Sequence, residues 1–124
     1  MDKFKFKLIS LEDRGKWGVY GVFYKNSNKC LYIGATTDLL RRVRDHHKPS
    51  QPLQRKHGID ISKVEFRILE NSKGIFKAAS YIWDHKNDKY RQLKWDLEYK
   101  EHVWVKKFEY THPLLNEKLT SKIK

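Results

Sequence analysis

A β-hairpin is encoded by two short segments, WGVYGVFY at residues 17–24 and CLYIG at residues 30–34. Both segments are rich in the aromatic and β-branched residues that favour strands. The five residues between them, KNSNK at 25–29, have the composition of a turn. The hairpin is therefore the element from which the rest of the fold is predicted.

The length of the turn predicts how the two strands pair. If Tyr24 faces Cys30, then Val22 faces Tyr32 and Tyr20 faces Gly34. Tyr20 and Tyr32 then lie on one face of the sheet as diagonal neighbours, with their hydroxyl groups within reach of each other. Two tyrosines on an amphipathic hairpin are also an ordinary structural feature, so the pairing alone does not decide between a structural and a chemical role.

The remaining patterns predict a small α+β domain. Thr36 or Thr37 is expected to cap the first helix, and alternation of lysine with apolar residues at 3–8 indicates a possible extra N-terminal strand. The other expected elements are a helix over 39–47, a short helix over 52–56, a strand over 64–68 and a long helix over 90–110. The order hairpin, helix, strand, helix predicts a three-stranded antiparallel sheet flanked by helices.

The chain length predicts one domain over residues 1–124. Within it, residues 1–16 are expected to be an N-terminal extension, residues 73–89 an insertion, and residues 117–124 a basic tail.

Charge and composition limit the function. The chain has 27 Lys and Arg against 15 Asp and Glu, a net charge of +12, which favours a polyanionic partner, nucleic acid first. Four Trp, seven Tyr and six Phe are too many for an unstructured basic tail. No apolar run approaches the ~20 residues that span a bilayer. With no signal peptide at the N-terminus and Cys30 as the lone cysteine, an intracellular location, cytoplasmic or nucleoid-associated, is expected.

Two predicted helices carry residues suited to chemistry. Arg42 and His46 are four residues apart and share one face of the first helix. Glu101 is the one carboxylate on the apolar stripe of the last helix, where burial is costly unless it pairs with a cation. An ion pair with an Arg explains such a residue as well as a Mg²⁺ site does. Glu98 is the alternative carboxylate, but it lies off the stripe.

Together these residues resemble the GIY-YIG nuclease family. The segments Gly18-Val19-Tyr20 and Tyr32-Ile33-Gly34, with eleven residues between them, are similar to its two-part signature, with Val19 in place of the usual Ile. The further matches are Arg42 and His46 on the next helix, Glu101 on the last helix and Asn116 beyond it.

The resemblance implies a divalent-metal-dependent DNA endonuclease. Glu101 would hold a single Mg²⁺ or Mn²⁺ ion at the scissile phosphate, and Tyr20 would take a proton from the attacking water. Because a free phenol has a pKa near 10, cations such as Arg42, and also Lys29 or Lys16, are expected to lower it. Arg42 would also stabilise the phosphate. Tyr32 and His46 would position water or phosphate, and Asn116 would orient the site by hydrogen bonding.

Exposed cations are expected to bind the DNA backbone without reading its sequence. The residues expected in this role are Arg41, Arg44, Lys48, Lys94 and Lys106. A homodimer is compatible with the resemblance, since two copies would cut both strands.

Three alternative hypotheses fit the sequence less well than the nuclease hypothesis. A non-catalytic basic nucleic-acid-binding protein would use its aromatic residues for stacking, but a buried carboxylate has no role in it. Glu98-Tyr99-Lys100 has the E-x-K form of another nuclease site, which requires a strand where the pattern here is helical. The His46, His47, His85 and Asn87 set has poor spacing for a ββα-metal nuclease.

Overall fold

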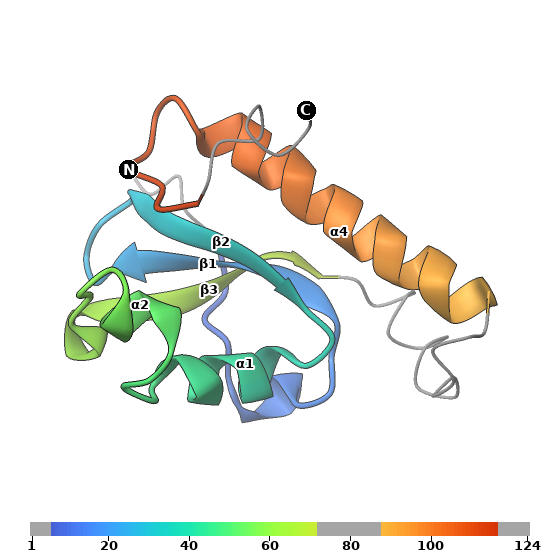
Figure 1. Cartoon of the computed structure of the whole chain (residues 1–124), viewed down its shortest axis with the longest axis horizontal. Helices are drawn as coiled ribbons and strands as arrows, with labels where there is room; N and C mark the ends of the chain where they lie inside the picture. Colours follow the sequence, from blue (N-terminus) through green and yellow to red (C-terminus); the bar gives the residue numbers. More distant parts are fainter. Residues whose placement is uncertain (1–5, 72–87, 117–124) are drawn as a thin grey trace.

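The computed structural model describes residues 6–71 and 88–116 (Figure 1). The elements are η1 (Leu11–Asp13), β1 (Gly18–Tyr24), β2 (Cys30–Thr36), α1 (Leu39–His46), α2 (Pro52–Arg55), η2 (Ile61–Lys63), β3 (Val64–Asn71) and α4 (Asp88–Phe108). The predicted α+β class and the predicted order of elements are confirmed. The expected tail at 117–124 lies outside the described residues, as does the expected insertion at 73–89 apart from its last two residues.

The three strands form an antiparallel sheet in the order β2-β1-β3. The predicted pairing is correct over most of the hairpin, with Tyr20 opposite Gly34 and Val22 opposite Tyr32. It is wrong next to the turn, where Cys30 pairs with Phe23 and not with Tyr24. A bulge between Val22 and Phe23 shifts the register by one residue there, and the tyrosine pair is unaffected.

Helices cover both faces of the sheet. In Figure 1 the long helix α4 crosses one face and the short helices α1 and α2 lie against the other. Two buried clusters correspond to these faces. Val19, Ile33 and Leu97 belong to the cluster under α4, and Leu39 and Leu53 to the cluster under α1 and α2. None of the described helices is long and apolar enough to cross a membrane.

The expected N-terminal strand is reduced to a brief pairing within the described residues. Leu8 forms an isolated bridge with Arg67 of β3, and the flanking backbone bonds join Ile68 N–H to Lys7 O and Ile9 N–H to Phe66 O. The pairing ends there because the chain turns into η1 at Leu11.

The predicted cap of α1 is also corrected. Asp38, and not Thr36 or Thr37, is the N-cap residue, and its carboxylate accepts from Arg41 N–H at 3.2 Å. The same carboxylate accepts from Gly15 N–H at 2.9 Å, so one side chain begins α1 and fixes the segment that leads into β1. Thr36 remains in β2, where its hydroxyl accepts from Asp38 N–H.

Candidate active site

Two tyrosines and a histidine meet on the α1 side of the sheet. Tyr20 is almost completely buried, and its hydroxyl oxygen lies 2.7 Å from Nε2 of His46. The ring of Tyr32 is 6.5 Å from that of Tyr20 and 6.1 Å from that of His46, centroid to centroid. The diagonal relation expected of the two tyrosines is therefore present.

The glycine of the second signature segment gives Tyr20 its place. A Cβ atom on Gly34 would lie 2.5 Å from Cζ of Tyr20. Only a residue without a side chain leaves room for the phenol ring, which lies directly over the paired strand. Gly18 has a similar function toward the helix, because a Cβ there would be 3.0 Å from Cδ1 of Leu39 in α1.

Helix α1 carries His46 and, one turn earlier, Arg42. His46 is buried and its ring stacks on Phe66 at 5.5 Å with an interplanar angle of 17°. The side-chain amide of Gln54 donates to the His46 carbonyl at 3.0 Å, which ties α2 to the end of α1. Sequence reasoning did not identify Phe66 or Gln54, because neither belongs to a motif.

Helix α4 places Glu101 at the same site. Leu97 and Val105, one turn on either side, are buried in the core, and Glu70 of β3 accepts from Lys100 Nζ and Trp104 Nε1, both at 2.9 Å. Glu101 is half-buried, less than the core position expected from the stripe. The negative charge of Glu101 adds to the effect of burial and raises the pKa of Tyr20 and of Tyr32. Glu98 is exposed.

The electrostatics of the tyrosines correct one expectation. Burial raises the pKa of Tyr20 well above its ordinary value of 10, and Arg42 opposes this rise without overcoming it. Burial likewise raises the pKa of Tyr32. Lys29 and Lys16 do not act on Tyr20: Lys29 donates to Thr111 O at 3.1 Å, and Lys16 lies 3.7 Å from Asp13. Desolvation of the phenol therefore outweighs the cations.

The pKa of His46 is shifted in the opposite direction. Burial, with a contribution from the positive charge of Arg42, lowers the pKa of His46 to about 4. The imidazole is therefore neutral at pH 7, and one of its nitrogens can accept a proton. Its other nitrogen, Nδ1, is buried and has no hydrogen-bond partner among the residues that the structure describes.

The segment after α4 closes the free edge of β2. Asn116 Oδ1 accepts from Ile33 N–H at 2.9 Å and Nδ2 donates to Ile33 O at 2.8 Å. Cys30 N–H donates to His112 Nδ1 at 2.9 Å, and the His112 ring stacks on Phe108 at 4.2 Å. These contacts hold the backbone on both sides of Tyr32. His112 was missed because a single histidine after a helix carries no sequence signal.

The chemistry of the site fits a hard divalent cation. The part of the chain that the structure describes contains no group of three or more His, Cys, Asp or Glu side chains that could hold a metal. Glu101 is a hard oxygen ligand, and Mg²⁺ is often held by one or two carboxylates with phosphate and water completing its shell. A one-carboxylate site is the arrangement expected of such an ion.

The predicted phosphate-binding residues are all at the surface. The exposed set is Arg41, Arg44, Lys48, Lys94 and Lys106. Lys48 also lies 3.3 Å from Asp45. Arg42 is only half-exposed, which separates it from these cations and places it with the tyrosines.

Comparison with known proteins identifies the family of the chain. The family model of the GIY-YIG catalytic domain matches residues 16–111. The chain therefore belongs to the GIY-YIG family, whose domain is that of a nuclease. No curated protein and no solved structure matches the chain.

Proposed function

We propose that the protein is a divalent-metal-dependent DNA endonuclease in which Tyr20 and His46 together activate the attacking water. The observation that carries the proposal is the 2.7 Å contact between the Tyr20 hydroxyl and Nε2 of His46. Arg42 and Glu101 lie close enough to influence the same hydroxyl.

The proposed proton path rests on the 2.7 Å contact and on the neutral state of His46. A phenol whose pKa is raised by burial does not ionise alone at neutral pH, whereas neutral His46 has an open lone pair. In the tautomer that leaves Nε2 unprotonated, Tyr20 passes its proton to Nε2 of His46 in the same step in which its oxygen takes the proton of the attacking water, so that no free phenolate forms. The hydroxide formed attacks phosphorus, and the bond from phosphorus to the leaving oxygen breaks.

Arg42 and Tyr32 complete the polar lining of the site. The Arg42 guanidinium is a planar, permanently charged donor that suits the extra negative charge on the phosphate in the transition state. Its charge also favours transient ionisation of Tyr20, since it lowers the pKa of that phenol against the effect of burial. Tyr32 positions water or phosphate beside Tyr20.

Glu101 would hold the metal, Mg²⁺ or Mn²⁺. A bound divalent ion supplies positive charge at the phosphate and at the leaving oxygen. Glu101 is suited to this role because α4 is anchored by Leu97, Val105 and the Glu70 contacts, so the carboxylate is held in place before substrate arrives. Asn116 would act as a positioning residue through Ile33.

DNA is the partner that the charge favours. The exposed cations named above would bind phosphates and should make binding fall steeply as salt rises. A homodimer stays a prediction, and so does an intracellular location.

Incubation with supercoiled plasmid tests the proposal. With Mg²⁺ we expect nicked and linear products, and with EDTA we expect none. Binding to DNA without cleavage in Mg²⁺ and in Mn²⁺ would contradict it and would support the non-catalytic binding protein instead.

A further inference from the structure

Helix α4 presents a second surface, on the side away from Glu101. Trp95 and Tyr99 are 70% and 62% exposed, and Val103 is 37% exposed. They recur at intervals of four residues, so they lie along one side of the helix. Residues two apart on a helix point in nearly opposite directions, so Tyr99 and Val103 face away from Glu101. Two exposed aromatic rings on one helix are not explained by core packing.

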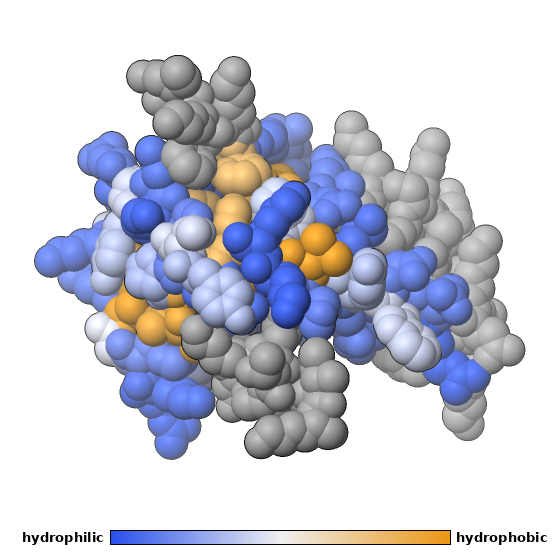
Figure 2. Space-filling view, turned by 90° about the horizontal axis from the view of Figure 1, so that it is seen from above, coloured by the Kyte–Doolittle hydropathy of each residue, from blue (hydrophilic) through white to orange (hydrophobic). Residues whose placement is uncertain are grey.

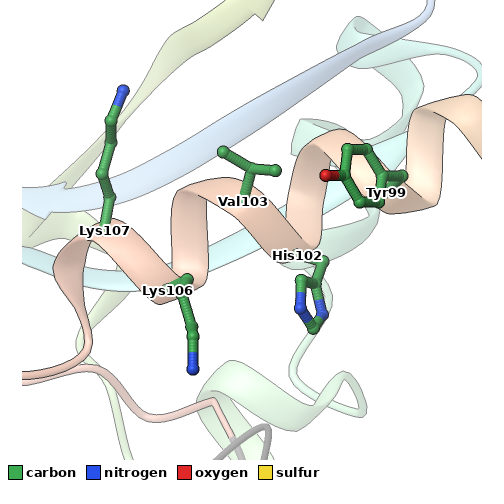
Figure 3. A pocket seen from close by; sticks show the side chains of 5 residues that line it. All are labelled: Tyr99, His102, Val103, Lys106 and Lys107. Atoms are coloured by element: carbon green, nitrogen blue, oxygen red, sulfur yellow. The ribbon is translucent and has the colours of Figure 1, made fainter.

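The surface includes a hollow. Tyr99, His102, Val103, Lys106 and Lys107 line a cavity of about 440 Å³ (Figure 3). The rings of Tyr99 and His102 are nearly parallel, at an interplanar angle of 12° with centroids 6.3 Å apart. In Figure 3, Lys106 extends to the same side of the helix as His102, and Lys107 extends to the other.

Charge and polarity select the occupant. An aliphatic protein partner is disfavoured because Val103 is the one aliphatic side chain among the residues that line the hollow. Figure 2 shows many hydrophilic residues on this side of the molecule, with apolar patches between them. The lysines favour an anion, in keeping with the net charge of +12. Lys107 lies over the Trp104 ring at 4.5 Å, which leaves Lys106 as the cation beside Tyr99 and His102.

We propose that Trp95, Tyr99, His102 and Lys106 form a stacking site for unpaired nucleotides of a DNA strand. Exposed aromatic faces stack on bases that are not already stacked in a duplex, and a neighbouring ammonium contacts the phosphate. This inference rests on the proposed function, because it supplies that same nuclease with a preference for substrates that have a single-stranded segment. A helix is about 10–12 Å across, so Tyr99 is separated from Glu101 by the width of α4, and His102 lies between these two sides.

The proposal is tested by binding in EDTA, where cleavage does not interfere. Labelled single-stranded oligothymidylate and a duplex of equal length are titrated with the wild type, Tyr99→Ala, Trp95→Ala and the control Tyr24→Ala. Tyr24 is an exposed tyrosine of β1 outside the hollow. Circular dichroism checks that each variant is folded.

We expect Tyr99→Ala and Trp95→Ala each to weaken binding of the single strand by about fivefold or more, with duplex affinity changed much less and Tyr24→Ala like the wild type. Single-strand affinity unchanged in both variants would overturn the proposal. Light scattering that shows a dimer for the wild type and a monomer for Tyr99→Ala would also overturn it, in favour of self-association. If the wild type does not cleave plasmid, but its single-strand binding depends on Tyr99 and Trp95 as expected, only the proposed function is contradicted.

Discussion

The hydroxyl oxygen of Tyr20 lies 2.7 Å from Nε2 of His46, and both side chains are buried. Burial raises the pKa of the tyrosine and lowers that of the histidine to about 4. The pair is therefore uncharged at neutral pH, and the 2.7 Å contact is a hydrogen bond between two neutral groups.

Tyr20→Phe removes the hydroxyl and keeps the ring that packs over Gly34. Proton transfer by a positioned group contributes about 10²–10⁴-fold to a rate, so we expect single-turnover plasmid nicking to slow by about 100-fold or more. Tyr24→Phe, an exposed tyrosine on the same strand, is the matched control. A rate for Tyr20→Phe within a fewfold of the wild type would remove this tyrosine from the mechanism.

Because burial lowers the pKa of His46, we expect the protein to lose stability in acid. Its pKa is about 4 in the folded protein and near 6.5 when exposed. Between these values the unfolded chain binds the extra proton and the folded protein does not, so the free energy of unfolding decreases as pH falls from about 7 toward 4. Urea unfolding at pH 7 and pH 5 measures this decrease. We expect it to be smaller in His46→Gln, and an equal decrease in both proteins would show that His46 is not the source.

Gly34→Ala tests the close approach of Tyr20 to β2. The added methyl group would fall 2.5 Å from Cζ of Tyr20, so the ring or the strand must move. Overpacking of this kind costs about 1–3 kcal/mol, and we expect a lower unfolding midpoint together with severe loss of nicking. Wild-type stability and activity in this variant would mean that the two groups are not so close.

Asn116, at the end of the described chain, holds the backbone of Ile33, the residue that follows Tyr32. Asn116→Asp keeps the acceptor for Ile33 N–H but loses the donor to Ile33 O, and Asn116→Ala loses both. We expect destabilisation of about 1–3 kcal/mol for the alanine variant, from the unpaired backbone groups. Nicking should slow in both variants, because β2 is less firmly held. The control is Asn28→Ala, at an exposed turn position, and equal effects at positions 28 and 116 would contradict this role.

The sequence was sufficient for the fold because strand alternation and helix periodicity are local. The pairing of Tyr20 with Gly34 follows from the turn length, but the bulge at Phe23 depends on how the turn closes and was not predicted. Thr36 or Thr37 was the expected cap of α1. Asp38 takes this position and also holds Gly15, which is 23 residues away, and the helix pattern does not show such a contact.

The residues of the candidate site could be predicted from the sequence, but their burial and pKa values could not. Cations near Tyr20 can be counted in a sequence, but burial, which decides the pKa of that phenol, cannot. Asn116 was selected by resemblance, while its partner Ile33 is 83 residues away. Glu101 is less buried than its stripe indicated, although Leu97 and Val105, one turn on either side, are buried in the core.

The central claim is that Glu101 provides the metal-dependent step of phosphodiester cleavage. The most direct measurement is nicking of supercoiled plasmid in Mg²⁺ by the wild type, Glu101→Gln and Glu98→Gln, with folding checked by circular dichroism. Glu98 is the matched control, an exposed carboxylate on the same helix. The account predicts that Glu101→Gln is inactive while Glu98→Gln cuts like the wild type. Wild-type cutting by folded Glu101→Gln would contradict it.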